Sequence, residues 1–303
     1  MRVLFSGDPF HPRQADEAYA GEAAAAERRG IAWSPLNFEA LVYEQDASQA
    51  VKHVPPAGGE DGTTVYRGWM LTGPQYGALS EALAARRVRL VNTPAEYEFC
   101  HTLPGWYGCL EGKTPRTVWT EASEDLSLPH LMDCLRPFGT GPVIVKDWVK
   151  SRKHEWYEAC FIPSAGDEAA VGRVVQRFLE LQGDDLNVGL VFREFVPLEP
   201  LTTHARSGMP LAREFRLFFL DGELLLATRY WDEGDYPDEA LPLDDFTRLA
   251  KRVQSRFFTM DVAKKADGGW IVVELGDAQV AELPPHADAE AFYGLLQERL
   301  TAS

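Results

Sequence analysis

The sequence has no apolar run of the roughly 18 residues that a helix needs to span a bilayer. The opening apolar run ends after a few residues, at residue 6, and polar residues follow it. It therefore does not continue as the apolar core of a signal peptide. The four cysteines include no Cys-x-x-Cys pair, so neither a disulfide framework nor a thiolate metal site is indicated. We therefore expect a cytoplasmic protein with reduced thiols and no membrane partner.

Sequence motifs of several enzyme classes are also missing. No G-x-G-x-x-G follows the first apolar run and no G-x-S-x-G occurs, which removes the basis for a dinucleotide oxidoreductase or an α/β-hydrolase. Segment 108–114 has three residues between its glycines, where a phosphate-binding Walker loop has four. His154 and Glu155 lack the second histidine of a zinc protease helix.

Positive charge is scarce. Lysine and arginine number 30 against 46 aspartates and glutamates, which gives a net charge of −16. Such a surface repels polyphosphate backbones and anionic membranes unless a local basic patch overrides it. Nucleic acid is therefore not an expected partner, although Lys150, Arg152 and Lys153 form one basic run.

The chain has 303 residues, of which 45% are hydrophobic and 25% charged, a mix typical of a folded globular protein with about two domains. The N-terminal third alternates apolar runs with helix formers, which predicts a doubly wound α/β domain over residues 1–114. Its predicted elements are strand 2–6, helix 15–29, strand 31–38, strand 63–70, helix 73–86 and strand 88–92.

The pattern changes after residue 114, and the remainder is predicted to form two α+β lobes, 115–192 and 193–303. In the first lobe we expect strands 116–120, 143–146 and 160–163 with helices 128–135 and 168–181. In the second we expect strands 190–196, 214–220, 223–230, 257–263 and 270–274 with helices 244–256 and 288–300. Asp221-Gly222 between two apolar runs is a strong hairpin signal.

Five short charged segments lie on these predicted strands. They are 143–146 with Lys150 and Lys153 just beyond, 193–196, 213–216, 260–262 and 272–277. Each has a simple structural explanation: a strand-end lysine needs no ligand, the 193–196 segment fits a core strand, and Arg216 can pair across strands with Glu214 or Glu223. Their order along the chain makes a shared site the stronger hypothesis.

The order and spacing of these segments resemble the ATP-grasp superfamily, in which two α+β lobes close on ATP and a preceding α/β domain helps to shape the substrate site. The motifs Val-Lys-Asp, Lys-Ser-Arg-Lys, Arg-Glu-Phe-Val, Glu-Phe-Arg-Leu-Phe-Phe-Leu-Asp-Gly and Val-Glu-Leu-Gly-Asp-Ala-Gln-Val are most similar to the R2K clade. The resemblance covers roughly residues 115–282, and the first 114 residues carry no motif specific to the family.

This resemblance implies a nucleotide site. Lys146, with Lys150 or Lys153 on the following turn, would neutralise the α- and β-phosphate oxygens of ATP. The segment Arg193, Glu194, Phe195 and Val196 would form the hinge strand that reads the adenine edge through its backbone.

The same resemblance implies a metal and a catalytic group. Asp261, Glu274 and Asp277 would hold Mg²⁺, a hard cation that prefers carboxylate oxygens. Relatives carry asparagine near the position of Asp277, which leaves the role of this carboxylate open. Arg216 would act with Lys146 on the γ-phosphate and on the developing acyl phosphate.

The implied reaction is ATP-dependent ligation of a carboxylate to an amine through an acyl phosphate, giving ADP and phosphate. The substrates would be small molecules or peptides. Three alternatives stay open: phosphoryl transfer to another acceptor, RNA modification, and a non-catalytic nucleotide-binding module. Arg67 and Trp69, which end a predicted strand, are candidates for contact with the carboxylate and the side chain of a substrate. An exposed arginine beside a packed tryptophan explains them equally well.

Overall fold

The computed structural model describes residues 1–58, 62–203, 210–237 and 240–302. Its N-terminal part is a parallel three-stranded sheet of order β2-β1-β3. The strands are β1 (Arg2–Ser6), β2 (Ala32–Leu36) and β3 (Thr64–Arg67). The helices are η1 (Glu17–Tyr19), α1 (Ala20–Arg28), α2 (Phe38–Val42), α3 (Ala47–Ala50), α4 (Gly73–Ala84), α5 (Pro94–His101), α6 (Leu103–Tyr107) and η2 (Gly108–Leu110).

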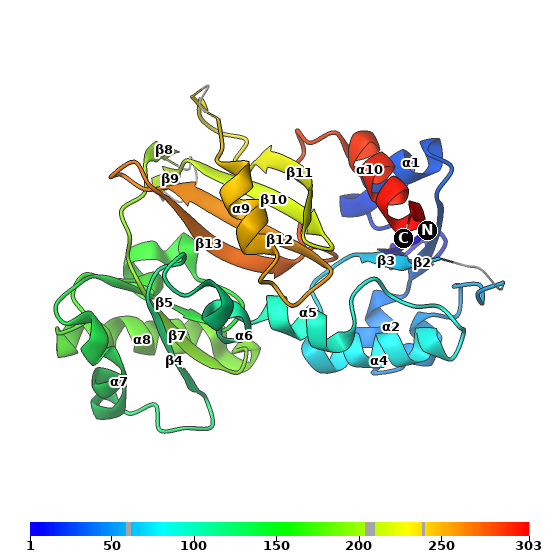
Figure 1. Ribbon diagram of the computed structural model, residues 1–303. Helices are drawn as coiled ribbons and strands as arrows, with labels where there is room; N and C mark the ends of the chain where they lie inside the picture. The colour runs from blue at the N-terminus through cyan, green and yellow to red at the C-terminus, as the bar shows by residue number, and fades with distance from the viewer. Residues whose placement is uncertain (59–61, 204–209, 238–239, 303) are drawn as a thin grey trace.

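Both faces of this sheet are covered, as the continuous apolar run of β1 requires, because successive side chains of a strand project from opposite faces. Val3 and Phe5 pack with α1 and with the C-terminal helix α10 (Ala289–Ala302). Leu4 packs on the other face against residues of α2, α3 and α4. Figure 1 shows α10 beside α1, at the opposite end of the chain. The predicted final helix is thus present, but it completes the N-terminal layer rather than the last lobe.

The central lobe is an antiparallel sheet of order β4-β7-β5-β6 with helices on one face. Its strands are β4 (Thr117–Glu121), β5 (Val143–Asp147), β6 (Phe161–Ile162) and β7 (Gly189–Glu194). Its helices are α7 (Leu128–Leu135), η3 (Arg136–Phe138), η4 (Lys153–Glu155), η5 (Trp156–Cys160), α8 (Glu168–Gln182) and η6 (Gly183–Asp185). Valines of β5 pack against α8, which leaves the opposite face of the sheet to the rest of the molecule.

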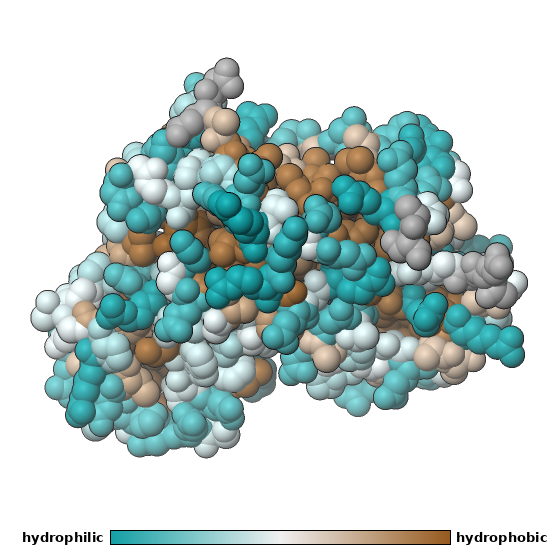
Figure 2. All heavy atoms as spheres, viewed as in Figure 1, coloured by the Kyte–Doolittle hydropathy of each residue, from teal (hydrophilic) through white to brown (hydrophobic). Residues whose placement is uncertain are grey.

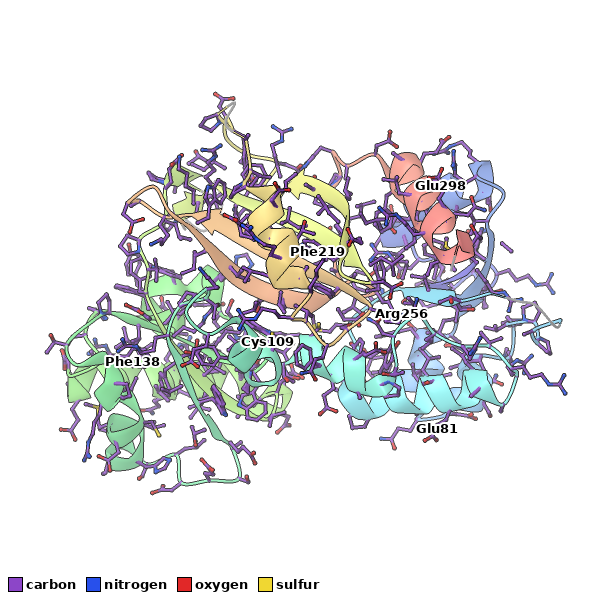
Figure 3. The ribbon with its side chains drawn as sticks, viewed as in Figure 1. Glu81, Cys109, Phe138, Phe219, Arg256 and Glu298 are labelled. Atoms are coloured by element: carbon purple, nitrogen blue, oxygen red, sulfur yellow. The ribbon has the colours of Figure 1, made fainter. Side chains whose placement is uncertain are left out.

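The C-terminal lobe is built on a second antiparallel sheet of order β11-β10-β12-β13. Its strands are β10 (Glu214–Leu220), β11 (Glu223–Arg229), β12 (Phe257–Lys264) and β13 (Trp270–Asp277), with helix α9 (Leu243–Ala250) and a separate hairpin of β8 (Pro200–Thr203) and β9 (Pro210–Ala212). Phe219 is buried and packs in one cluster with Phe246 and Ala250 of α9, and Figure 3 labels it beside this helix. Asp221 and Gly222 have positive φ angles of 51° and 77°, the conformation that a tight hairpin turn demands.

The predicted fold class, α/β followed by two α+β lobes, is confirmed. The predicted helix 128–135 and strand 214–220 match α7 and β10 residue for residue. The predicted strand 88–92 is wrong as a strand, because only a single bridge between Thr64 and Leu90 forms there. Hydrophilic side chains cover most of the face in Figure 2, with apolar groups showing between α9 and α10. Within the described ranges, no helix combines the length and the apolar character of a membrane span.

Candidate active site

Three charged side chains lie in one row across the C-terminal sheet. Arg216 on β10 is the direct partner of Asp261 on β12, and Asp261 is the direct partner of Glu274 on β13. Directly opposed residues of antiparallel strands project from the same face. Met260 and Val262 on either side of Asp261 are fully buried in the core on the other face. The alternation that buries these two side chains therefore directs Asp261 toward Arg216 and Glu274.

Arg216 and Asp261 form a buried bidentate ion pair. Nε and Nη2 of Arg216 donate to the two carboxylate oxygens of Asp261 at 2.9 and 2.8 Å. The guanidinium carbon lies 4.7 Å from the centroid of the Tyr230 ring. Burial by itself lowers the pKa of Arg216, but the charge of Asp261 and its hydrogen bonds more than offset burial and raise it. Arg216 is therefore held in its charged form, and the ion pair offsets part of the cost of desolvating the two groups.

A second ion pair joins the two lobes. Lys146 lies on β5 of the central lobe, is only 5% exposed, and donates from Nζ to Oε1 of Glu274 at 2.5 Å. Burial raises the pKa of Glu274, but the charges of Lys146 and Lys153 outweigh burial and lower it to about 2. Glu274 is therefore ionised at neutral pH, and a cation from the facing lobe reaches the row of charges.

Lys153 and Glu214 extend this cluster. Burial lowers the pKa of Lys153, but the acidic groups around it, Tyr230 and Glu214 foremost, raise it above its ordinary value. Burial raises the pKa of Glu214 to about 7, with the charge of Lys153 as the main opposing effect. Glu214 lies two residues before Arg216 on β10, so both side chains share one face of the strand.

A cavity of about 150 Å³ continues from this cluster between the two lobes. The chain segment that connects β7 to the C-terminal lobe forms one wall, and Lys153 and Glu214 form its polar end. The lining residues are Pro115, Ile144, Lys153, Trp156, Arg193, Glu194, Phe195, Val196, Leu198, Pro210, Ala212, Glu214, Trp231, Ile271 and Val273. An apolar slot with a few charged groups at one end suits a planar ring that carries a charged tail.

Arg193 holds the lobes together at the back of this cavity. Its Nη1 donates to the Val273 carbonyl and its Nη2 to Oγ1 of Thr114, and its guanidinium lies 5.8 Å from the ring of Trp106. Burial lowers the pKa of Arg193 to about 10. Among the described residues, its buried Nε has no hydrogen-bond partner, and neither does the buried Nε1 of Trp231 in the same wall. Two orphaned donors at one cavity are consistent with a site for a ligand that has hydrogen-bond acceptors.

The structure does not bring Lys150 into the cluster. This lysine is exposed, and its Nζ makes no hydrogen bond or ion pair within the part of the chain that the structure describes. Its backbone amide donates to the Asp147 carboxylate, which also accepts the amide of Val149 at 2.7 Å. Asp147 therefore fixes the turn after β5, and Lys153, which is half-buried, rather than Lys150 provides the second cation.

Asp277 is also separate from the row of charges. It lies three residues after Glu274 on β13, so its side chain projects from the opposite face. Its carboxylate accepts from Asn92 Nδ2 at 2.5 Å and from the Gln279 amide at 2.9 Å, and it is 1% exposed. It joins the C-terminal sheet to the N-terminal domain, and the structure does not group it with Asp261 and Glu274 as a metal ligand.

Asp277→Asn is expected to change the pH dependence of stability. Burial raises the pKa of Asp277 to about 7 from an ordinary 3.8, so the folded protein retains a proton that the unfolded chain has lost. The stability that this proton contributes is complete below pH 3.8 and is lost as the pH rises through 7. Relative to Asp277→Asn, the wild type should lose up to about 4 kcal/mol of unfolding free energy across this window, measured by urea denaturation.

The same variant separates the two roles of Asp277. If the role of Asp277 is purely structural, Asp277→Asn should leave the Mg²⁺ dependence of ATP-induced stabilisation unchanged. Loss of that dependence would show instead that the carboxylate takes part in metal binding.

The two predicted substrate residues have different surroundings. Arg67 is fully buried; its Nε and Nη2 donate to Glu22, and its Nη1 donates to the carbonyls of Ala278 and Ala281. It therefore acts as a structural tie between the domain core and the chain after β13, and the prediction that it meets a substrate carboxylate does not fit this position. Trp69 is 44% exposed and lines a separate pocket.

The sequence predictions did not indicate Glu214 as a member of the site, nor His101 as a titratable group near it. Glu214 was considered only as a partner for Arg216, although the i, i+2 spacing on a strand already places both on one face. His101, at the end of α5, is close enough to Lys150 and Lys146 for their charges to add to burial, which lowers its pKa to about 4. No sequence signal indicates His101, because it reaches the lobes from the N-terminal domain.

Comparisons with known proteins agree with this geometry. The model of a family described as ATP-grasp domain, R2K clade family 3, matches residues 137–296, which is more than half of the chain. A search of curated proteins found none that matches the sequence.

Solved structures similar to this chain share its fold over almost their whole length. A RimK domain protein ATP-grasp from Sphaerobacter thermophilus has a TM-score of 0.64 at 15% identity and covers 99% of each chain. The D-cycloserine synthetase DcsG has a TM-score of 0.61 at 16% identity over 99% of this chain and 100% of its own. D-alanyl-alanine synthetase A from Vibrio cholerae has a TM-score of 0.56 at 11% identity over 99% and 98%. The predicted ATP-grasp fold is confirmed.

Proposed function

The chain belongs to the R2K clade of ATP-grasp domains, and we propose that it is an ATP-dependent ligase that joins a carboxylate to an amine through an acyl phosphate. The observation that carries this proposal is the meeting of charges from two lobes. Lys146 from the central lobe contacts Glu274, in line with the Arg216–Asp261 pair of the C-terminal lobe. The names of two similar structures, a D-cycloserine synthetase and a D-alanyl-alanine synthetase, fit the same class of reaction.

The cavity between the lobes is where ATP would bind. Its apolar walls suit the adenine ring. The amides of Glu194 and Phe195 already donate to the carbonyls of Arg116 and Pro142, so the carbonyls of segment 194–196 and the Val196 amide are the backbone groups that would meet the ring edge. Lys153 and Lys146 follow at the polar end and would bind phosphate oxygens as point charges. Glu214 lies at the same end, where its carboxylate can accept a hydrogen bond from a ribose hydroxyl.

The donor set also fits Mg²⁺. Asp261 and Glu274 are opposed on neighbouring strands, and Mg²⁺ in nucleotide sites is usually held by one or two carboxylates together with phosphate oxygens and water. No group of three or more potential metal ligands occurs among the described residues, so these two carboxylates are the proposed ligands. When bound, Mg²⁺ would supply positive charge to the phosphate oxygens.

Arg216 and Lys146 would perform the electrostatic part of catalysis. The substrate carboxylate attacks the γ-phosphorus of ATP, the bond to the bridging oxygen breaks, and ADP leaves with the electron pair. The guanidinium of Arg216 and the ammonium of Lys146 stabilise the negative charge that develops on the transferring group. The amine then attacks the acyl carbon, phosphate departs, and an amide remains. Positioning and charge suffice for this chemistry, which needs no protein nucleophile.

The proposal is tested by trapping the acyl phosphate. Hydroxylamine replaces the unknown amine, and a panel of amino acids and small carboxylic acids is incubated with ATP and Mg²⁺. We expect at least one acid to give a hydroxamate together with equal amounts of ADP and phosphate. Lys146→Ala should give none of these products, whereas Lys251→Ala, a change at an exposed lysine of the C-terminal lobe, should behave like the wild type.

Other outcomes would replace the proposal with one of its alternatives. ADP that forms with a phosphorylated acceptor and without free phosphate would indicate a phosphotransferase. Tight ATP binding without ADP formation for any acid would indicate a non-catalytic nucleotide-binding module.

A further inference from the structure

A second pocket, of about 440 Å³, opens between the N-terminal domain and the chain that leads into α10. Three segments line it: residues around η1 and the start of α1, the two residues Trp69 and Met70 after β3, and the stretch 280–289. It lies next to the row of charges, because the carbonyl of Glu282 in its wall accepts from Arg216 Nη1 at 3.0 Å. A molecule held here is therefore beside the proposed site of phosphoryl transfer.

The walls of this pocket are apolar, aromatic and fixed in place. Tyr19 and Trp69 meet edge to face with ring centroids 5.5 Å apart, and Leu283 adds an aliphatic surface. The Trp69 indole donates to Asp16 at 3.2 Å, which holds the ring although Trp69 is 44% exposed. Met70 is 42% exposed at the same wall. A large exposed aromatic surface that is already positioned indicates a binding site for an apolar or aromatic group.

The charges around the pocket discriminate between the two substrates of a ligase. Among the residues that the structure describes, no lysine or arginine lines the pocket. The two nearby guanidiniums are already engaged: Arg67 with Glu22 and two carbonyls, and Arg216 with Asp261 and the Glu282 carbonyl. A carboxylate that entered would lose its hydration without gaining a cation.

An ammonium group in the pocket would gain negatively charged partners. The Glu282 side chain lines the pocket, is exposed, and makes no hydrogen bond or ion pair within the described ranges. Asp16 adds a second carboxylate beside Trp69, and the electron-rich faces of Tyr19 and Trp69 attract cations. The pocket therefore complements a positively charged group attached to an apolar one.

We propose that this pocket binds the amine substrate, as an apolar or aromatic compound with a primary ammonium group that pairs with Glu282 and a side chain that packs on Trp69. The role of this pocket in the reaction rests on the proposed ligase function. The binding of an amine there is argued from the pocket alone. A free amine and the N-terminus of a peptide present the same chemistry, so the test includes both.

The test uses three compounds of matched shape and different charge. Phenethylamine, 2-phenylethanol and 3-phenylpropionate are titrated into the full chain without nucleotide, with binding followed by calorimetry. Phenylalanyl-glycine amide is titrated as the peptide form of the amine. We expect the ammonium compounds to bind at least tenfold more tightly than the alcohol, and the carboxylate to bind most weakly. Equal or tighter binding of 3-phenylpropionate would overturn the proposal.

Two variants locate the binding. Glu282→Gln should remove the preference for phenethylamine over 2-phenylethanol, and Trp69→Ala should weaken both, with recovery in Trp69→Phe. Both side chains are exposed, and the hydrogen bonds that tie these segments to Arg216 and Ser6 come from their backbones, so the fold should persist. Glu298→Gln on α10 is the control for a lost surface charge and should bind like the wild type.

The outcomes separate this inference from the proposed function. If phenethylamine binding is unaffected by Glu282→Gln and by Trp69→Ala while ATP still stabilises the protein, the pocket assignment is wrong and the nucleotide site stands. If the amine binds as described but hydroxamate never forms, the pocket stands as a binding site and the ligase proposal fails.

Discussion

Lys146→Ala is expected to abolish the stabilisation that ATP and Mg²⁺ give to the protein. In the wild type, a ligand at about 100 times its Kd adds about 2.7 kcal/mol to the unfolding free energy, a rise of several degrees in Tm for a chain of this size. Lys146 is 5% exposed and contacts Glu274. Its loss removes a cation from the phosphate site and leaves the Glu274 carboxylate facing the triphosphate without its direct ion-pair partner.

The measurement is a thermal-shift titration with ATP, ADP and GTP, with and without Mg²⁺. Each variant is compared with its own ligand-free melting temperature, because Lys146→Ala also removes the ion pair between the lobes and lowers stability on its own. Lys146→Met, which keeps most of the side-chain volume, is the second variant if the alanine form does not fold. Lys251→Ala should retain the full shift. A Lys146 variant that keeps the wild-type shift would contradict the assignment of the phosphate site.

Breaking the Arg216–Asp261 ion pair is expected to lower both stability and turnover. A variant that lacks both charges separates the effect on stability from the effect on turnover. Arg216→Met and Asp261→Leu each leave a buried charge without its partner, which costs about 3–5 kcal/mol of unfolding free energy. Their combination removes both charges, so the double variant should recover much of that loss. Urea denaturation of the wild type and the three variants measures the coupling.

Turnover should not recover with stability. Because Arg216 is proposed to stabilise the transferring phosphoryl group, its loss should lower kcat by roughly 10²–10³-fold in the single variant. The loss should be at least as large in the double variant, which also removes Asp261, a proposed Mg²⁺ ligand. The conservative change Arg216→Lys keeps the charge but not the bidentate geometry and should be intermediate. If the double variant is both stable and fully active in the hydroxamate assay, the pair is structural only and another cation must meet the γ-phosphate.

Local sequence patterns predicted most of the architecture. Apolar runs indicated β10 and β12, the Asp221-Gly222 dipeptide indicated the turn between β10 and β11, and the helix predicted over 128–135 is α7. These features depend on contacts between residues close in the chain, which is why the sequence displays them. The order of the charged motifs was enough to indicate the family.

The sequence could not place side chains that depend on distant partners. Asp277 and Glu274 lie three residues apart, and only the pairing of β13 with β12 and the approach of Asn92 decide that Asp277 belongs to the domain junction. Arg67 has the position expected of a substrate contact, but Glu22 and the chain after β13 enclose it completely.

What the sequence by itself determined is the class of fold, the family and several of the charged residues that the site uses, Lys146, Arg216, Asp261 and Glu274 among them, because these follow from residue types and from the order of the motifs. What only the tertiary structure decided is which of those charges meet. Lys146 and Glu274 are 128 positions apart, and they come together because the central and C-terminal lobes meet at this point. The pocket beside Trp69 likewise exists only because the C-terminal helix returns to the N-terminal sheet and brings Glu282 with it. Strand register and domain packing are set by the sum of many weak contacts, and no short sequence motif specifies that sum.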